Sequence, residues 1–287
     1  MADRQGGAAL DPGLYVVSTP IGAARDITLR ALDVLAQADA IAAEDTRTTR
    51  KLLDIHGISL SGRPLIPYHD HNGPEQRPRI LAMIAAGQSV AYVSDAGTPL
   101  VADPGFVLAR EAAEAGFRVR AAPGPSAILA ALVVSGLPSD RFLFAGFLPP
   151  GAAARERVLR ELAPVPATLI FFETARRSLE SLQSLATVFG ETRQGALCRE
   201  LTKKFEEIRR GSLAELAQSV RVDPPKGEIV FLVDRDRAGV GAAERDAMLK
   251  EALKTMSVKD AARHVSDCLS LPRREVYQAA LAMGAGT

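Results

Sequence analysis

The sequence predicts an α/β protein made of two α/β domains, followed by a small helical segment at the C-terminus. Two observations predict this class. Over the first 135 residues, short apolar runs alternate with segments of helical spacing, which is typical of a mostly parallel sheet covered by helices. A second series of strands and helices follows, and a chain of 287 residues is long enough to give both units a core.

The first unit is predicted to span residues 13–135. Its apolar runs predict strands at residues 14–18, 40–43, 65–68, 90–93 and 117–121. The segments between them predict helices at residues 28–37, 46–55, 76–86, 106–115 and 125–134. Gly57, Gly87 and Gly116 end three of these helices. Residues 1–12 lack the basic start and apolar core of a signal peptide, and we expect a flexible tail there.

The second unit is predicted to span residues 136–236, with a connection at residues 137–141. Strands are expected at residues 142–146, 168–172, 195–198, 205–210 and 228–233, in a more mixed sheet. Helices are expected at residues 152–162 and 177–188. A polar linker at residues 235–241 leads to residues 243–287, where breaks near residues 255–257 and 270–272 predict three short helices.

Composition narrows the functional class. A net charge of +1 means that any nucleic-acid binding would depend on local basic patches. Cys198 and Cys268 are too few for a disulfide framework or a cysteine metal site, so we expect a reducing, cytoplasmic environment and no bound metal. No apolar run approaches the roughly 20 residues that cross a bilayer, so no membrane partner is expected.

Four loops that follow predicted strands contain glycine, proline and small polar residues. They lie at residues 18–22, 43–47, 94–99 and 123–126. Open α/β sheets bind ligands at the carboxyl ends of their strands, and small residues let a ligand approach the backbone. The alternative is a set of ordinary strand-to-helix turns. None of the loops has the GxGxxG or GxxxxGK[ST] pattern, which argues against a nicotinamide dehydrogenase and an NTPase.

Seven short motifs occur in one order along the chain. They are TPIG at 19–22, AEDTR at 43–47, HDHN at 69–72, SDAGTP at 94–99, PGPS at 123–126, RELTK at 199–203 and KGE at 226–228. This set resembles the tetrapyrrole-methylase superfamily, and within it the branch that methylates the ribose 2′-oxygen of a cytidine in bacterial 16S rRNA. The resemblance covers about residues 13–235 and, weakly, the helical segment that follows. One departure is Ala23, because the family usually has Asn after Pro-Ile-Gly.

The resemblance implies a homodimer that holds S-adenosylmethionine in the cleft between the two α/β domains. Carried over to this sequence, the cofactor contacts would come from Pro20, Asp95, Gly97, Thr98, Ser126, Ala127, Phe172 and Gly227. Backbone groups near glycine suit the polar parts of this cofactor, and aromatic faces suit its adenine. Because strand residues alternate between faces, one of Phe171 and Phe172 is expected to belong to the core.

Methyl transfer from a sulfonium depends on alignment and needs no metal, but a ribose hydroxyl is a poor nucleophile that a general base would help. The candidate bases are Glu44, Asp45, His69, His71, Asp95, Glu173 and Glu200. The preferred catalytic set is Glu44, Asp45, Arg47, His69 and His71, because both of their loops should reach the same sheet edge. Arg47 would hold a phosphate. The alternatives are charge stabilisation of a helix start by the two carboxylates and a solvated histidine loop.

The expected partner is 16S rRNA in the small ribosomal subunit. The candidate phosphate-binding cations are Arg155, Arg157, Arg160, the pair Arg176 and Arg177, the pair Lys203 and Lys204, and the pair Arg209 and Arg210. An ordinary solvated surface is the alternative for each pair. Two other functions remain open at this point: a porphyrin or corrin methylase of the same fold, and a non-catalytic ribosome-associated binding module.

Overall fold

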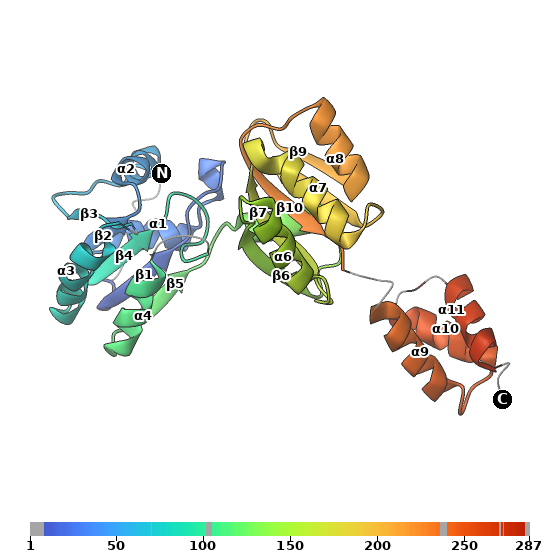
Figure 1. The fold of residues 1–287 in the computed structure, drawn as a ribbon. Coiled ribbons are helices and arrows are strands. Elements are labelled where there is room, and N and C mark those ends of the chain that lie inside the picture. The colour runs from blue at the N-terminus through green and yellow to red at the C-terminus, as the bar shows by residue number, and fades with distance from the viewer. Residues whose placement is uncertain are drawn as a thin grey trace.

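The computed structural model describes residues 9–69, 71–101, 105–235, 240–269, 271 and 273–284. Two five-stranded sheets with their helices and a group of three helices follow one another along the chain (Figure 1). Residues 1–8 of the expected tail, Asp70 of the HDHN motif and residues 236–239 of the expected linker lie outside the described residues. The predicted α/β class with a helical C-terminal segment is confirmed.

The first sheet is entirely parallel. Its strands are β1 (Gly13–Val17), β2 (Ala40–Ala43), β3 (Leu65–Pro67), β4 (Ser89–Val93) and β5 (Val119–Ala122), in the order β3-β2-β4-β1-β5. Its helices are α1 (Leu29–Gln37), α2 (Thr46–Ile55), α3 (Gly73–Ala85) and α4 (Phe106–Glu114). Since β1 lies between β4 and β5, the loops after these three strands emerge side by side at the carboxyl edge.

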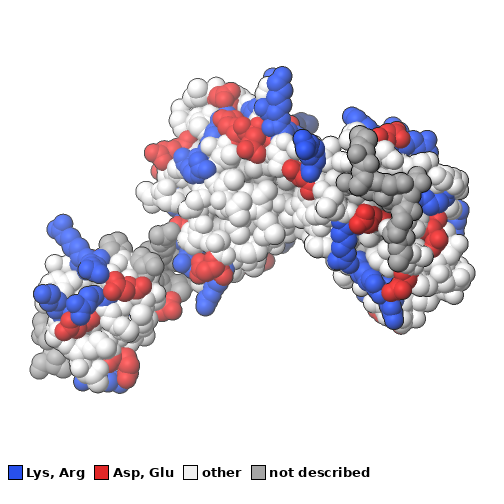
Figure 2. Space-filling view, turned by 180° about the vertical axis from the view of Figure 1, so that it is seen from behind, with Lys and Arg blue, Asp and Glu red and all other residues white. Residues whose placement is uncertain are grey.

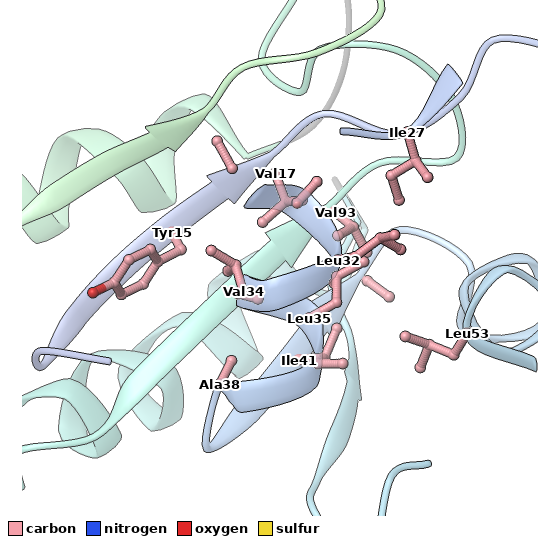
Figure 3. Close-up of a cluster of buried hydrophobic side chains, with 14 residues drawn as sticks. Tyr15, Val17, Ile27, Leu32, Val34, Leu35, Ala38, Ile41, Leu53 and Val93 are labelled. Carbon is pink, nitrogen blue, oxygen red and sulfur yellow. The ribbon is translucent and has the colours of Figure 1, made fainter. Parts of the chain in front are cut away.

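Apolar side chains cover both faces of this sheet. Figure 3 shows one cluster, in which Leu32 and Leu35 of α1 pack against Val17, Ile41 and Val93 of the strands. The other face packs against α3 and α4 through a second buried cluster. Helix α1 starts at a capped position, because the Thr28 side chain accepts a hydrogen bond from the amide of the third helical residue. The packing on both faces holds the strands in place, and with them the loops at their carboxyl ends.

The second sheet is mixed, as expected. Its strands are β6 (Phe142–Phe147), β7 (Thr168–Thr174), β8 (Gln194–Arg199), β9 (Glu207–Ser212) and β10 (Glu228–Val233), in the order β6-β7-β10-β8-β9. Only the β6–β7 pair of these strands is parallel. Helices α6 (Ala152–Leu162), α7 (Ser178–Phe189) and α8 (Leu213–Val222) share a buried apolar cluster with the sheet. Two short 3-10 turns complete the two units, at Ala24–Asp26 and Ala175–Arg177.

Helix α5 (Ala127–Ser135) joins the two units. It begins at the carboxyl edge of the first sheet but packs against β8, β9 and β10 of the second. Ile128, Ala131 and Leu132 share a buried cluster with Ile170 and Val230 of the second sheet. The helix therefore presents its N-terminus to the region between the sheets.

The C-terminal segment consists of α9 (Val240–Ala252), α10 (Val258–Leu269) and α11 (Arg273–Gly284). The three helices pack on one another through a buried cluster that includes Leu249, Val265 and Val276. Figure 1 shows them set apart from the two sheets. Within the described ranges, no helix combines the length and the apolar character that a membrane crossing requires.

Candidate active site

Three of the predicted strand-end loops are bonded into one surface. Thr19 and Gly97 exchange two backbone hydrogen bonds, with N···O distances of 2.9 and 3.0 Å. The Ser18 hydroxyl donates to Thr98 Oγ1 at 3.2 Å, and that hydroxyl donates to the Pro125 carbonyl at 3.0 Å. Gly97 has φ +82°, a left-handed conformation that glycine adopts without strain. Loops from β1, β4 and β5 thus form one continuous wall.

A cavity of about 350 Å³ lies between this wall and the second sheet. The first unit and the start of α5 contribute Ile21, Glu44, Asp95, Ala96, Gly97, Thr98, Val101, Ser126, Ala127 and Ile128. The second sheet contributes Phe147, Phe172, Glu173, Thr174, Gly227, Glu228, Ile229 and Val230. Every residue predicted to contact the cofactor lies in this lining except Pro20, which directly precedes Ile21.

The two adjacent phenylalanines of β7 separate as the alternation of strand residues predicts. Phe171 is fully buried in the core, whereas Phe172 lines the cavity. The Phe172 ring meets the Phe147 ring edge-on, with centroids 5.7 Å apart. The next residue, Glu173, has no exposed side chain and accepts hydrogen bonds from Ser181 Oγ at 2.5 Å and Arg177 Nε at 2.9 Å. This network fixes the end of β7 that carries Phe172.

These residues fit a nucleoside that bears a charged chain. Aromatic and aliphatic side chains offer flat apolar contact for a purine. Ser126 makes no side-chain cap at the start of α5, so backbone amides at this helix start can bind ligand oxygens. Glu44 and Asp95 bring carboxylates to the lining, which suits a ligand with positively charged groups.

Three acidic side chains, Glu44, Asp45 and Asp95, lie just after the carboxyl ends of β2 and β4. Glu44 Oε2 accepts a hydrogen bond from the Asp95 amide at 3.1 Å. Desolvation, together with the nearby charges of Glu44 and Asp45, raises the pKa of Asp95. Asp45 behaves differently, because its hydrogen bonds from Arg47 lower its pKa to about 2. Asp95 therefore holds a proton more readily than Asp45 does.

The other predicted catalytic residues lie outside the cavity lining. Asp45 caps α2 and pairs with Arg47 at 2.7 Å, and the Arg47 side chain is 90% exposed. His69 is half-buried, and its Nδ1 has no hydrogen-bond partner among the described residues. His71 is exposed. The two imidazole centroids are 6.0 Å apart. The structure thus brings Glu44 and Asp95 together in the cavity lining, which does not include His69 or His71.

Residues 13–217 match the family model of tetrapyrrole (corrin/porphyrin) methylases. The chain belongs to this family. Residues 240–284, which form the three C-terminal helices, match a second model, the RsmI C-terminal HTH domain. These matches confirm the family that the ordered motifs predicted, and with it a methyltransferase.

Curated relatives of this tetrapyrrole methylase match nearly the whole chain. "Ribosomal RNA small subunit methyltransferase I" of Mesorhizobium japonicum is 49% identical, over 94% of this chain and 91% of that protein. The protein of the same name in Escherichia coli O157:H7 is 43% identical, over 93% and 94%. A uroporphyrin-III C-methyltransferase from Thermus thermophilus, solved with S-adenyl homocysteine, has TM-score 0.53 and 19% identity, over 77% and 96%. This last likeness shows the fold.

Ala23 stands where the family usually has Asn, and the turn that contains it is held by a backbone hydrogen bond. Its backbone amide donates to Thr202 Oγ1 at 3.1 Å, across the crevice between the two units. Gly22 packs equally closely, because a Cβ there would lie 2.5 Å from the same hydroxyl. Thr202 was not among the predicted site residues, although it lies in the RELTK motif, whose Glu200 was one of the candidate bases.

Most of the predicted phosphate-binding cations are engaged within this tetrapyrrole methylase. Arg155 is buried and donates to Ser184 Oγ at 2.9 Å. Arg209 pairs with Asp223 at 2.6 Å, and Arg210 donates to backbone carbonyls of α5. These three side chains thus have partners within the protein, and the expected RNA-binding role of the set stays a prediction. Figure 2 shows basic and acidic side chains interspersed on the face that it displays.

Proposed function

We propose that the protein transfers a methyl group from S-adenosylmethionine to the ribose 2′-hydroxyl of a cytidine in the 16S rRNA of the small ribosomal subunit. The observation that carries this proposal is the cavity, which gathers strand-end loops of one sheet and an aromatic wall of the other. The names of the curated relatives support ribosomal RNA of the small subunit as the substrate.

The chain's own groups would bind and orient the donor. The adenine would rest against Phe172, and backbone groups at Gly97 and at the start of α5 would bond the polar parts. When bound, S-adenosylmethionine supplies a methyl group activated by a positively charged sulfur. Holding the ribose hydroxyl in line with that methyl group contributes most of the expected rate gain.

We assign the proton acceptor to Asp95. It lines the cavity, and its pKa is raised, whereas the pKa of Asp45 is lowered. Asp95 is therefore the better acceptor of the two for a hydroxyl proton. Glu44 would orient Asp95, because its carboxylate accepts the Asp95 backbone amide. Positioned general bases typically contribute about 10²- to 10⁴-fold to a rate.

Arg47, His69 and His71 would serve the RNA and not the donor. The guanidinium of Arg47 is open to solvent at the rim, where a phosphate of the substrate can bind it. His69 and His71 lie at the start of the neighbouring loop, after β3, and would contact the same stretch of backbone. Asp45 would hold Arg47 in place through their ion pair.

The C-terminal helices would dock the protein on the small subunit, which their match to a helix-turn-helix domain supports. A homodimer is the proposed assembly. Its support is the exposure of the apolar side chains Leu129 and Val133 on α5 and Phe142 on β6, and the broad uncharged area of the second unit in Figure 2. The proposed compartment is the cytoplasm, where ribosomes are assembled.

The two alternative functions are less well supported. Solved structures of a cobalt precorrin-4 methyltransferase and a uroporphyrin-III C-methyltransferase share the fold at 18% and 21% identity, which says nothing of the substrate. Ala23, in place of the usual Asn, is the sequence feature that would favour a non-catalytic binder, but its turn is held by the hydrogen bond to Thr202.

The test uses small subunits from a strain that lacks the corresponding gene. Incubation with the protein and S-adenosylmethionine should produce one 2′-O-methylated cytidine in 16S rRNA, mapped by mass spectrometry of nuclease fragments. The proposal fails if the donor is bound and no ribose methylation results.

A further inference from the structure

The loop between β8 and β9, residues 200–206, is fixed to both sides of the crevice. Thr202 accepts the hydrogen bond from Ala23 of the first unit. Lys203 Nζ contacts Glu200 at 3.0 Å and Glu228 at 2.9 Å, and Glu228 lines the cavity. Gly227 leaves no space for a Cβ beside the Glu200 carboxylate. The base of this loop is therefore held beside the cavity.

The backbone of the loop base is strained. Glu200 has φ +49° and Thr202 has φ +62°, in the left-handed region that residues other than glycine rarely adopt. A β-branched residue such as threonine is a marked outlier there, and such conformations persist where the surroundings enforce them, often at functional sites.

The loop presents a cation and an aromatic ring together. Phe205 is 62% exposed, and Lys204 Nζ lies 5.4 Å from the centroid of its ring. The main chain here is held, since the Phe205 carbonyl accepts a hydrogen bond from Arg199 Nε at 3.4 Å. Lys204 makes no ion pair with any residue that the structure describes, whereas the adjacent Lys203 is bound by two carboxylates.

An unpaired nucleotide matches both features. Its base offers a flat face for Phe205, and its phosphate offers a negative charge for Lys204. Proteins recognise single-stranded RNA by such stacking, and a ribose that enters the cavity must belong to a segment pulled free of its helix. An apolar protein surface would match the ring but would leave the lysine ammonium without a counter-charge.

We propose that Phe205 stacks on the base of a nucleotide that neighbours the target ribose, while Lys204 binds its phosphate. This proposal rests on the proposed function and names a contact that sets how the rRNA is positioned. The fixed loop base transmits that position to the cavity, because Thr202 and Lys203 touch its two walls.

The experiment compares Phe205→Leu with Phe205→Tyr. Leucine keeps apolar bulk but removes the stacking face, and tyrosine keeps the face. The measurements are the Kd for unmethylated small subunits, the KM for the same subunits and the Kd for S-adenosylmethionine. Phe205→Leu should weaken subunit binding by roughly 5- to 150-fold, the value of one stacked base. Phe205→Tyr should bind as the wild type does, and both should bind the donor normally.

Lys204→Gln tests the phosphate contact, with Arg221→Gln as its control. Arg221 is an exposed cation on α8 of the same unit. Lys204→Gln should lower the slope of log Kd against log salt concentration by about one, and Arg221→Gln should leave the slope unchanged.

Two results would overturn the proposal. One is a Phe205→Leu protein with the wild-type Kd and KM for subunits. The other is a changed oligomeric state of that variant in light scattering, which would assign Phe205 to an interface between copies. Failure of the proposed function is seen separately, because the wild-type protein would then leave the subunits without a ribose methyl group.

Discussion

Gly97 is the residue at which fold and donor binding are most tightly linked. It has φ +82°, exchanges two hydrogen bonds with Thr19 and lines the cavity. A Cβ there would make ordinary contact, 3.4 Å from Ile21 Cγ2, so Gly97→Ala is limited by the backbone and not by space. The left-handed conformation costs alanine about 1–2 kcal/mol. Loss of glycine's freedom in the unfolded chain offsets about 0.4–1 kcal/mol.

The net cost is about 1 kcal/mol, or roughly 3–6 °C in Tm for a domain of this size. Gly87→Ala is the matched control, because Gly87 has φ +85° and no atom within 4 Å of a Cβ. Both variants should lose similar stability in thermal melts. The branched side chain of Gly97→Val should in addition occupy the cavity and remove detectable S-adenosylmethionine binding in calorimetry. A Gly97→Val protein that binds the donor with the wild-type Kd would refute this reasoning.

Three further predictions follow from the site. Thr202→Val should leave the Ala23 amide unpaired and destabilise the protein by about 1–3 kcal/mol in denaturant unfolding, and Thr202→Ser should not. Asp95→Asn should lower kcat by about 10²- to 10⁴-fold. Because the pKa of Asp95 is raised in the folded protein, its ionisation destabilises the fold, and the Asn variant should have a higher Tm than the wild type at neutral pH. The difference in Tm should disappear as the pH falls through the pKa of Asp95. A difference that does not change with pH would contradict the raised pKa. Phe171→Ala should lower the free energy of unfolding by about 3–5 kcal/mol, whereas Phe172→Ala should mainly raise the Kd for the donor. Equal effects of the two variants on unfolding and on donor binding would contradict the placement of Phe171 in the core and Phe172 in the cavity.

Local sequence patterns predicted most elements of both sheets, because apolar runs and glycine stops act within a few residues. Helix α8 was missed, although its capping box was readable: the Ser212 side chain accepts from the Glu215 amide, and the Glu215 carboxylate binds the Ser212 amide. Helix α3 begins at Gly73, earlier than predicted, because Pro74 stands at its start, where proline is tolerated.

The site was predictable only in part. Small residues after strands indicated the cavity wall, since parallel topology brings those loops together. The roles of charged residues depend on partners that are distant in sequence, such as Arg210 with the end of α5 and Lys203 with Glu228. The packing of α5 on the second sheet is likewise set by tertiary contacts, so a pattern within the helix could not indicate it.

We place the methyl donor in the crevice between the two sheets. A crystal structure of the protein with S-adenosylhomocysteine tests this most directly. We expect density for the nucleoside between the Gly97 loop and Phe172, with the sulfur facing Asp95. Density at any other place on the protein, with the crevice empty, would contradict it.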